Sequence, residues 1–389
     1  NSLQQELKRR SANLGEDERH SLHCRIQNTR TEKREAEVLA NTAIPTAYDN
    51  RLAKLDLIEE WPRQVRQIRN DIQTGTYHSR EFGDVKDIGF RSVGEGQRDD
   101  VERGRQAVEE MKRADLMPDE VENEAIVAYV ENLTEKIARN SDLRVPAKIT
   151  VLNGSEINAF ALPGGFLFVQ RGLLEATEDE AQLAGVIAHE IAHAAARHGH
   201  QLMKRATISQ IIYQVAQVAA MVLTGGVAGI GTYYALQYGF YGLGLFLNLN
   251  LLGVSRDFEL EADQLGVQYA WKSGYDPTGF IRFFDKMASE KGYVRGASWF
   301  RTHPPFYERM WKTKREIMYL PDSQDDLVKT TSEYEAMKQE LKGVTQKAEE
   351  KSKDAPSLLA PEKGCPEPDV PDYEAGQEVR ALCRDIERT

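Results

Sequence analysis

The chain contains 389 residues, of which 41% are hydrophobic and 29% charged, and this globular composition excludes a disordered chain or a collagen-like fibre. Its 61 acidic and 50 basic residues give a net charge of −11, which repels a phosphate backbone, so no nucleic-acid partner is expected. The length predicts two or three domains.

The three cysteines exclude a fold built on disulfides and a cysteine zinc module, whose ligands come in close pairs. Cys24, Cys365 and Cys383 are too scattered in the sequence for either. If a disulfide forms, we expect it to join Cys365 to Cys383 within the C-terminal tail. The chain opens with Asn1 and without a targeting segment, so we expect any such segment to have been removed ahead of this numbering.

Residues 1–86 are dense in charge and predict a helical N-terminal extension. Pro62 lies inside its apolar stripe and predicts either a helix that restarts there or a kink. The apolar residues of the stripe recur in steps of three and four, which is the helical period. They are Leu55, Ile58, Trp61, Val65, Ile68 and Ile72.

Residues 87–320 carry the signals of a globular domain. An amphipathic pattern over 121–138 predicts a helix, and runs rich in β-branched or aromatic residues at 148–152 and 166–170 predict two strands. A largely apolar run over 178–193 predicts one buried helix. The expected fold class is mainly α with a small β-sheet (α+β).

The 50 residues of 206–255 contain no charged side chain. This length suffices for two membrane spans of about 20 residues each. The glycines of the run, among them Gly225, Gly229 and Gly231, also suit a buried hairpin or lid whose helices pack closely. Three interpretations stay open for this hydrophobic run: a buried hairpin, contact with a membrane surface, and true spanning.

Residues 321–389 are polar again. The stretch 330–353 is rich in Lys and Glu and predicts an exposed helix. Several prolines crowd into the acidic stretch 356–371 and exclude a helix there. We interpret 321–389 as a charged helix followed by a Pro-rich C-terminal tail.

His189 and His193 enclose Glu190 in the sequence His-Glu-Ile-Ala-His, and Thr177 is placed to cap the start of this helix. Four residues along a helix give about 6 Å of rise and about 40° of rotation, so both imidazoles leave one face and can share a tetrahedral zinc ion. Glu190 is adjacent, where its carboxylate can act as general base on water without binding the metal. On an exposed helix this pattern can be coincidence, but buried polar groups require partners.

A catalytic zinc needs three protein ligands and one open position. The two histidines that follow the motif are poor candidates for the third ligand. On a continued helix His198 points about 140° away from His193, and His200 lies about 10 Å further along the axis. We therefore assign neither to the site.

A better third ligand lies downstream. Glu259 and Asp263 are four residues apart on an apolar stretch and share a helix face. One of these carboxylates can bind the metal, and the other can accept the second ring N–H of a ligand histidine. Glu261 is turned away from both and fits a solvated acidic face.

Four motifs in this order resemble metallopeptidase family forty-eight, the gluzincin zinc endopeptidases of the CAAX prenyl protease, HtpX and periplasmic BepA/LoiP type. The resemblance covers about residues 87–320. The soluble envelope branch is the most similar, because the chain lacks the several clear spans of the prenyl proteases. This chain departs from BepA because a charged helix and a Pro-rich tail stand in place of tetratricopeptide repeats. The motifs are 158–165, His189 to His193 with Arg197-His198 after it, Glu259-x-x-x-Asp263, and 302–309.

The resemblance implies the roles of the metal-binding residues. Glu259 is implied as the third ligand of one Zn²⁺ per chain, beside His189 and His193. Asp263 is implied as the carboxylate that supports a ligand histidine. The same resemblance implies a zincin catalytic domain built around the helix that carries both histidines.

Other residues are implied to act on the substrate. His303 and Arg309 would polarise the scissile carbonyl and stabilise the oxyanion. His303 has a second implied role, as a fourth zinc ligand that displaces the catalytic water and gates the site, and we favour this role. Asn158, Ala159 and Phe160 resemble the edge strand on which an extended substrate pairs, although Phe160 also fits plain core.

These residues predict a zinc metalloendopeptidase in which activated water attacks a peptide carbonyl and Glu190 transfers the proton. By analogy with the branch, the expected substrates are unfolded or misassembled proteins of the bacterial cell envelope. The expected location is the periplasm, peripheral to a membrane that the 206–255 run contacts. The alternative is a zinc-latched chaperone or assembly factor with little proteolysis, in which His303 closes the metal site. A third interpretation is a membrane-embedded protease for lipidated substrates. The sequence indicates no oligomeric state.

Overall fold

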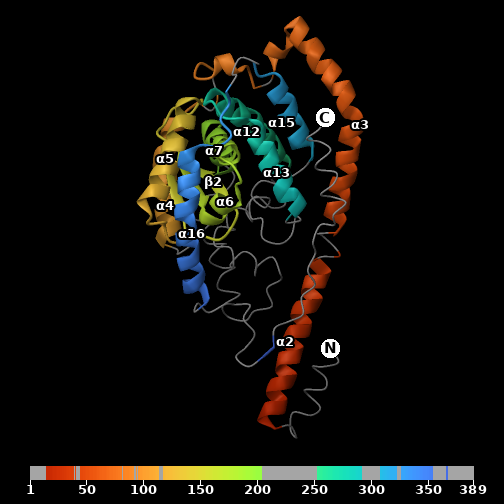
Figure 1. The fold of residues 1–389 in the computed structure, drawn as a ribbon, viewed down its shortest axis with the longest axis vertical. Helices are drawn as coiled ribbons and strands as arrows, with labels where there is room; N and C mark the ends of the chain where they lie inside the picture. Colours follow the sequence, from red (N-terminus) through yellow and green to blue (C-terminus); the bar gives the residue numbers. More distant parts are fainter. Residues whose placement is uncertain are drawn as a thin grey trace.

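A computed structural model gives the fold in Figure 1. It describes residues 15–38, 40, 44–80, 82–91, 93, 95–113, 117–203, 252–290, 307–321, 326–353 and 365–366. Most of the hydrophobic run 206–255 and His303 therefore lie outside the described residues. Among the helices that are described, none combines the length and the apolar character needed to cross a membrane.

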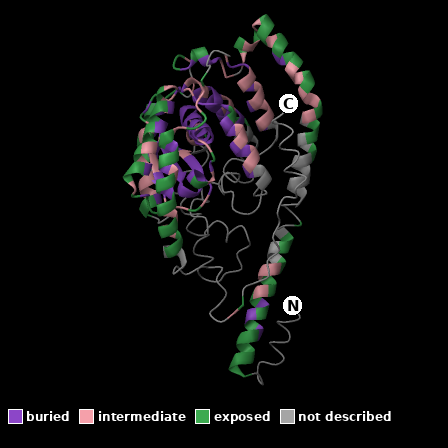
Figure 2. Ribbon diagram, in the orientation of Figure 1, coloured by how far each residue is buried: buried purple, intermediate pink, exposed green. Residues whose placement is uncertain are grey.

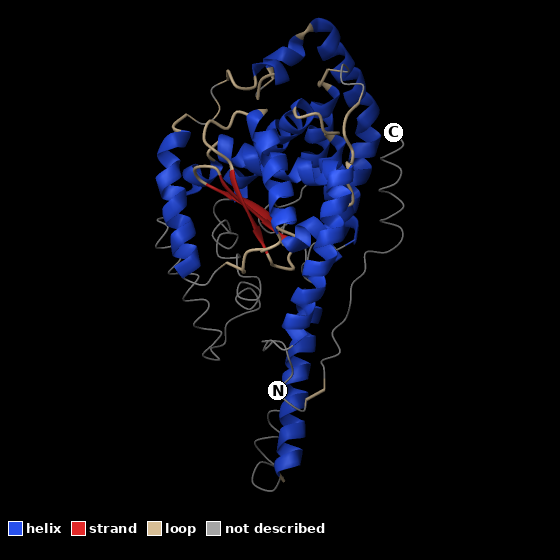
Figure 3. Ribbon diagram, turned by 60° about the vertical axis from the view of Figure 1, so that its left-hand side comes forward, coloured by secondary structure: helices blue, strands red, loops and turns tan. Residues whose placement is uncertain are grey.

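The described part is mostly helical with one small sheet (Figure 3), which confirms the α+β class. Two long helices come first, α2 (Glu16–Val38) and α3 (Ile44–Thr74). The helices of the body are α4 (Asp100–Arg113), α5 (Glu124–Arg139), α6 (Arg171–Ala176), α7 (Glu180–Ala195), α8 (His198–Met203), α12 (Leu252–Lys272), α13 (Thr278–Glu290), α15 (Tyr307–Met318) and α16 (Ser332–Lys353). The strands are β1 (Lys148–Leu152), β2 (Ala159–Leu162) and β3 (Phe166–Gln170).

The strands form one sheet in the order β1-β3-β2. β1 runs parallel to β3, with Lys148 opposite Phe166, and β2 runs antiparallel to β3, with Ala159 opposite Val169. The tight turn between β2 and β3 contains Gly164 at a φ of 80°, a conformation that favours glycine. β2 is the last strand in the described sheet order and packs against α7, so it lies beside the helix that carries both motif histidines.

α7 is the buried centre of the fold. All its residues except His193 are buried, because α5, α12, α13 and the sheet pack around it (Figure 2). The helix begins after Asp179, whose side chain accepts the backbone N–H of Gln182 at 2.9 Å. The prediction of a cap at Thr177 was wrong, because Thr177 ends the preceding helix α6 and its hydroxyl donates to the carbonyl of Leu174.

Glycine permits the close approach of helices to α7. A Cβ on Gly266 of α12 would lie 3.0 Å from both the Cα and the N of His189. A Cβ on Gly185 of α7 would lie 2.7 Å from the Cβ of Phe280 in α13. Both separations are shorter than ordinary van der Waals contact, so larger residues would push the helices apart. The side chains of α12 consequently lie directly against the histidines of α7.

The helix expected to be exposed, α16, is partly buried. Tyr334, Met337 and Leu341 recur in steps of three and four, and none is more than 2% exposed. They join the main core beside α5 and α6, and the Tyr334 hydroxyl donates to the carbonyl of Thr177 at 2.9 Å. Most other described residues of α16 are exposed, as expected, and a narrow apolar stripe is enough to bury one face of a helix that is otherwise rich in Lys and Glu.

The N-terminal extension consists of two long helices along one side of the body (Figure 1). α3 continues through Pro62 as one helix, and its C-terminal end packs on α15. There, Ile68 is fully buried and Asp71 accepts the hydroxyl of Tyr319 at 2.8 Å. Most other residues of α2 and α3 whose burial is described are exposed or half-buried (Figure 2), so the contact at α15 anchors the C-terminal end of α3.

A disulfide joins Cys24 of α2 to Cys365, with the two Cα atoms 5.3 Å apart. Beside it, the amide of Asn28 donates to the carbonyl of Pro366 at 2.8 Å. The predicted pairing of Cys365 with Cys383 was therefore wrong. Proximity in sequence favours that pairing, but the fold brings the N-terminal arm to a segment 341 residues away.

Peptide mapping under non-reducing conditions tests this connection. We expect one linked pair of peptides that contains Cys24 and Cys365 and that separates on reduction. Cys24→Ser should abolish the pair, whereas Ser21→Ala, almost one turn earlier on α2, should leave it intact. A linked pair containing Cys365 and Cys383 in the parent protein would contradict the structure.

Candidate metal centre

Three side chains from two helices meet at one point. His189 and His193 leave the same face of α7, and their Nε2 atoms are 3.0 Å apart. Glu259 of α12 faces both, with Oε2 3.5 Å from the Nε2 of His189 and Oε1 3.4 Å from the Nε2 of His193. One ligand atom from each residue lies within 4.8 Å of the others. The three predicted ligands are therefore brought together.

The donor set suits zinc. Two imidazoles and one carboxylate are a ligand set of catalytic zinc sites, whereas calcium and magnesium prefer oxygen ligands alone. Among the described residues a second group of potential ligands consists of His20, Cys24 and Cys365. Its two sulfurs are joined in the disulfide, so no thiolate is available there. The cluster on α7 and α12 is thus the group that fits the ion.

Asp263 contacts one of the two histidines. It lies one turn after Glu259 on α12, and its Oδ1 is 2.9 Å from the Nδ1 of His189. A carboxylate in this position accepts the N–H of His189 and leaves the Nε2 for the metal. The contact supports the role that the family resemblance implies for Asp263, and that role stays a prediction.

Arg309 of α15 holds both carboxylates. Its Nε and Nη2 donate to the two oxygens of Asp263, each at 2.7 Å, and its Nη2 lies 2.9 Å from Oε2 of Glu259. Burial raises the pKa of Asp263, but the guanidinium of Arg309 and the imidazole of His189 together outweigh burial and bring that pKa below its usual range. The fully buried Arg309 thus balances two buried acids. Its action on an oxyanion stays a prediction.

The same acids act on His189. Burial lowers the pKa of this imidazole, but the hydrogen bond to Asp263 and the contact with Glu259 outweigh burial and raise the pKa to about 9. Zinc binds the neutral imidazole. At neutral pH, zinc must therefore displace a proton from His189 when it binds.

Glu190 lies next to the cluster and is 2% exposed. Burial lowers the pKa of Arg309, while Asp263, Glu259 and, to a lesser extent, Glu190 raise it above its ordinary value. The carboxylate of Glu190 is therefore part of the same electrostatic environment as the candidate ligands. Its action as general base stays a prediction.

His198 does not lie where a continued helix would place it. α7 ends at Ala195, and Arg197 adopts a positive φ of 59° before α8 begins. This turn brings the Nδ1 of His198 to 2.8 Å from the Nδ1 of His193. The direction predicted for His198, about 140° away from His193, was wrong because it assumed an unbroken helix, but His198 is not part of the candidate ligand group.

Two further residues near this turn have defined contacts. His200 lies away from the cluster, with its Nδ1 2.6 Å from Oδ1 of Asp100, which also accepts from Arg197. Glu261, expected on a solvated face, is half-buried, and its Oε2 lies 3.2 Å from the Nε2 of His198. Glu261 is therefore only partly solvated, because one of its oxygens contacts a buried imidazole.

The predicted substrate strand is β2 with the residue before it. Asn158 is buried, and its carbonyl accepts the N–H of Gln170 at 2.9 Å. Ala159 and Phe160 belong to β2, whose second edge pairs with no strand in the part of the chain that is described. The ring of Phe160 stacks on Phe168 with centroids 4.7 Å apart, so its side chain is core, as one interpretation held. Substrate pairing on this edge stays a prediction.

Residues 124–317 match peptidase family M48. This segment belongs to that family. The result confirms the resemblance of the four motifs, and the matched segment lies within the 87–320 range expected from sequence. His189, His193, Glu259 and Arg309 all belong to the M48 segment.

The M48 segment has relatives in bacteria and in mitochondria. The chain is 29% identical over 187 residues to the beta-barrel assembly-enhancing protease of Yersinia pestis, covering 46% of this chain and 36% of that protein. It is 27% identical over 187 residues to the protein of the same name in Escherichia coli K12, with the same coverage. It is 30% identical over 199 residues to the mitochondrial metalloendopeptidase OMA1 of Schizosaccharomyces pombe, covering 50% of this chain and 53% of that protein. The chain thus spans about a third to a half of these relatives.

Asp263→Asn tests the buried network of the M48 segment. The change removes one of the two carboxylates that pair with Arg309. It also removes the carboxylate that contacts the Nδ1 of His189. We expect the free energy of unfolding to fall by about 3 to 5 kcal/mol. We expect zinc affinity to fall about 10- to 100-fold. Urea denaturation of the chelated protein and competition with a zinc-binding dye measure the two effects.

The control is Asp257→Asn, on an exposed position of the same helix, which should change neither quantity. An Asp263→Asn protein as stable and as tightly zinc-binding as the parent would show that the network does not support the site.

Proposed function

We propose that the chain is a zinc metalloendopeptidase that binds one Zn²⁺ through His189, His193 and Glu259. The observation that carries the proposal is the convergence of these three side chains inside a segment of family M48. Zinc held by such ligands polarises a carbonyl oxygen and makes water a nucleophile near neutral pH. The names of the relatives, a protease and a metalloendopeptidase, support the same reaction.

The residues around the ion would carry the proton and the substrate. Glu190 takes the proton of the attacking water and delivers it to the leaving amine nitrogen. β2, which packs against α7, is proposed as the strand beside which an extended peptide aligns. Arg309 holds Glu259 and Asp263 in place, so the ligands keep their geometry while charge develops on the substrate.

We further propose unfolded or misassembled proteins of the bacterial cell envelope as substrates. Two relatives are named for enhancing β-barrel assembly, which supports protein substrates of this kind. The disulfide between Cys24 and Cys365 supports an oxidising compartment such as the periplasm. Contact of the 206–255 run with a membrane surface belongs to this proposal and rests on its uncharged sequence.

His303 is proposed as a gate for the same site. It lies six residues before Arg309, which contacts Glu259. Six residues extend at most about 20 Å, a length that permits His303 to reach the proposed metal site. As a fourth ligand it would occupy the position that water needs, and as an oxyanion donor it would leave that position open.

Glu190→Gln tests the proposed chemistry. The amide is nearly isosteric but takes no proton, so we expect zinc content and fold to be kept while peptide hydrolysis falls about 10²- to 10⁴-fold. Metal analysis and digestion of an unfolded protein such as casein, with and without a chelator, measure these properties. Glu131→Gln, on an exposed position of α5, is the matched control and should digest casein as the parent does.

Full hydrolysis by the Glu190→Gln protein would assign the base to another residue. A parent protein that binds zinc but digests nothing would favour the zinc-latched chaperone or assembly factor.

A further inference from the structure

His198 is a buried residue held in a defined orientation. It is 1% exposed, and its ring stacks on Phe258 of α12 with centroids 4.3 Å apart and an interplanar angle of 13°. The ring approaches His193 edge-on, with centroids 4.9 Å apart. The left-handed turn at Arg197 directs it there. Packing between α7 and α12 therefore fixes the direction of both nitrogens of His198.

Both nitrogens have partners. The Nδ1 of His198 lies 2.8 Å from the Nδ1 of His193, and its Nε2 lies 3.2 Å from Oε2 of Glu261. These distances define a chain of hydrogen bonds that runs from His193 through His198 to a carboxylate. Glu261 belongs to α12, as Glu259 and Asp263 do, but it leaves a different face of that helix.

The proposed metal site decides which ring nitrogen of His193 and of His198 carries the proton. The Nε2 of His193 faces Glu259 and the Nε2 of His189, so this nitrogen is the candidate ligand and carries no proton when zinc binds. The Nδ1 of His193 must then carry the ring proton and donate it to the Nδ1 of His198. That leaves the proton of His198 on its Nε2, where it donates to Glu261.

We propose that His198 and Glu261 are positioning residues that fix the tautomer and orientation of the zinc ligand His193. The inference rests on the proposed zinc site. It assigns to each of the two histidine ligands a separate carboxylate that orients its ring. His189 is supported directly by the carboxylate of Asp263, while His193 is supported by the carboxylate of Glu261 through an intervening imidazole. A hydrogen-bonded partner on the second ring nitrogen orients a metal-binding histidine.

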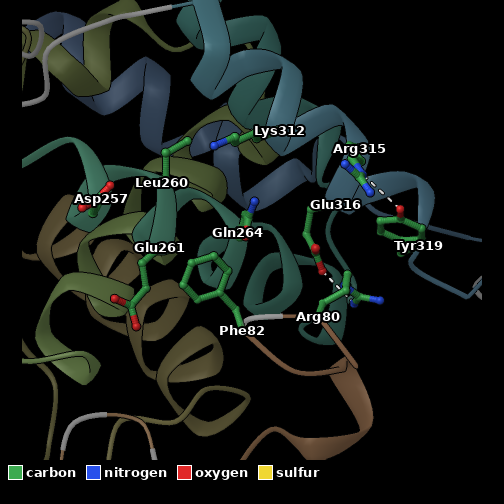
Figure 4. Close-up of a pocket in the computed structure, with 10 residues that line it drawn as sticks. All are labelled: Arg80, Phe82, Asp257, Leu260, Glu261, Gln264, Lys312, Arg315, Glu316 and Tyr319. Carbon is green, nitrogen blue, oxygen red and sulfur yellow. Dashed lines mark hydrogen bonds and ion pairs between the residues drawn. The ribbon is translucent and has the colours of Figure 1, made fainter. Parts of the chain in front are cut away.

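The outer end of this chain reaches a cavity. Glu261 lines a cavity of about 410 Å³ between α12, α15 and the segment around Phe82 (Figure 4). Leu260 and Gln264 line the cavity from the same helix, and Lys312 lines it from α15. The side chain of Glu261 is 29% exposed, so this carboxylate can be replaced without opening the core.

The test measures the zinc dissociation constant of the full chain by competition with a chelating dye. His198→Phe keeps an aromatic ring against Phe258 but removes both nitrogens, and we expect zinc to bind about 10- to 100-fold more weakly. Glu261→Ala should weaken zinc binding in the same direction, because His198 loses its acceptor. Glu261→Gln retains a carbonyl oxygen that accepts the N–H, so it should restore binding toward the parent value.

Two further variants separate positioning from packing. The double variant His198→Phe/Glu261→Ala should bind zinc no more weakly than His198→Phe alone, because both changes break one chain of hydrogen bonds. Asp257 lines the same cavity from the same helix, and the Asp257→Ala protein should bind zinc as the parent does. Circular dichroism of each chelated protein checks that it is folded.

Parental zinc affinity in a folded His198→Phe protein would overturn the inference. If that variant does not fold, equal dissociation constants for Glu261→Ala and Glu261→Gln would overturn it instead. A parent protein that binds no zinc would contradict the proposed function itself, and the support of His193 with it. If the parent protein and the His198 and Glu261 variants all bind zinc equally tightly, only the inference about His193 would be contradicted, and the proposed zinc site would stand.

Discussion

The close packing of α12 against α7 is the constraint on which the metal site depends. Gly266 lets the two backbones approach at His189, and this approach puts three acids of α12 within reach of the histidines of α7 and α8. Glu259 faces the candidate ligand nitrogens, while Glu261 and Asp263, two and four residues further along α12, contact His198 and His189. The pair α7 and α12, together with His198 of the adjoining α8, therefore supplies the candidate ligands and the groups that contact them.

This arrangement buries charges that would be costly alone. Removing an ionised carboxylate from water is strongly unfavourable unless a partner of opposite charge accompanies it. Arg309 meets this requirement for Glu259 and Asp263, and it comes from α15, outside the helix pair. α15 in turn packs against the end of α3, so the N-terminal arm adjoins the helix that neutralises the site.

Local patterns predicted most of the elements and the candidate ligands, because helical period and residue spacing are local properties. They yielded α5, α7, α12 and two of the strands, and they paired His189 with His193. They left Glu259 and Asp263 open as the third ligand, and the family resemblance chose Glu259, which the fold brings to both histidines. They failed where contacts between distant segments decide the outcome. The Cys24 disulfide depends on the path of the arm, and the position of His198 depends on a turn that a straight helix does not contain.

The central claim is that α7 and α12 together hold one zinc ion. Anomalous diffraction at the zinc edge, from crystals of the full chain grown with zinc, tests it most directly. The account predicts one peak about 2.0 to 2.2 Å from the Nε2 atoms of His189 and His193 and from an oxygen of Glu259. A zinc peak at other residues, or no peak between α7 and α12, would contradict it.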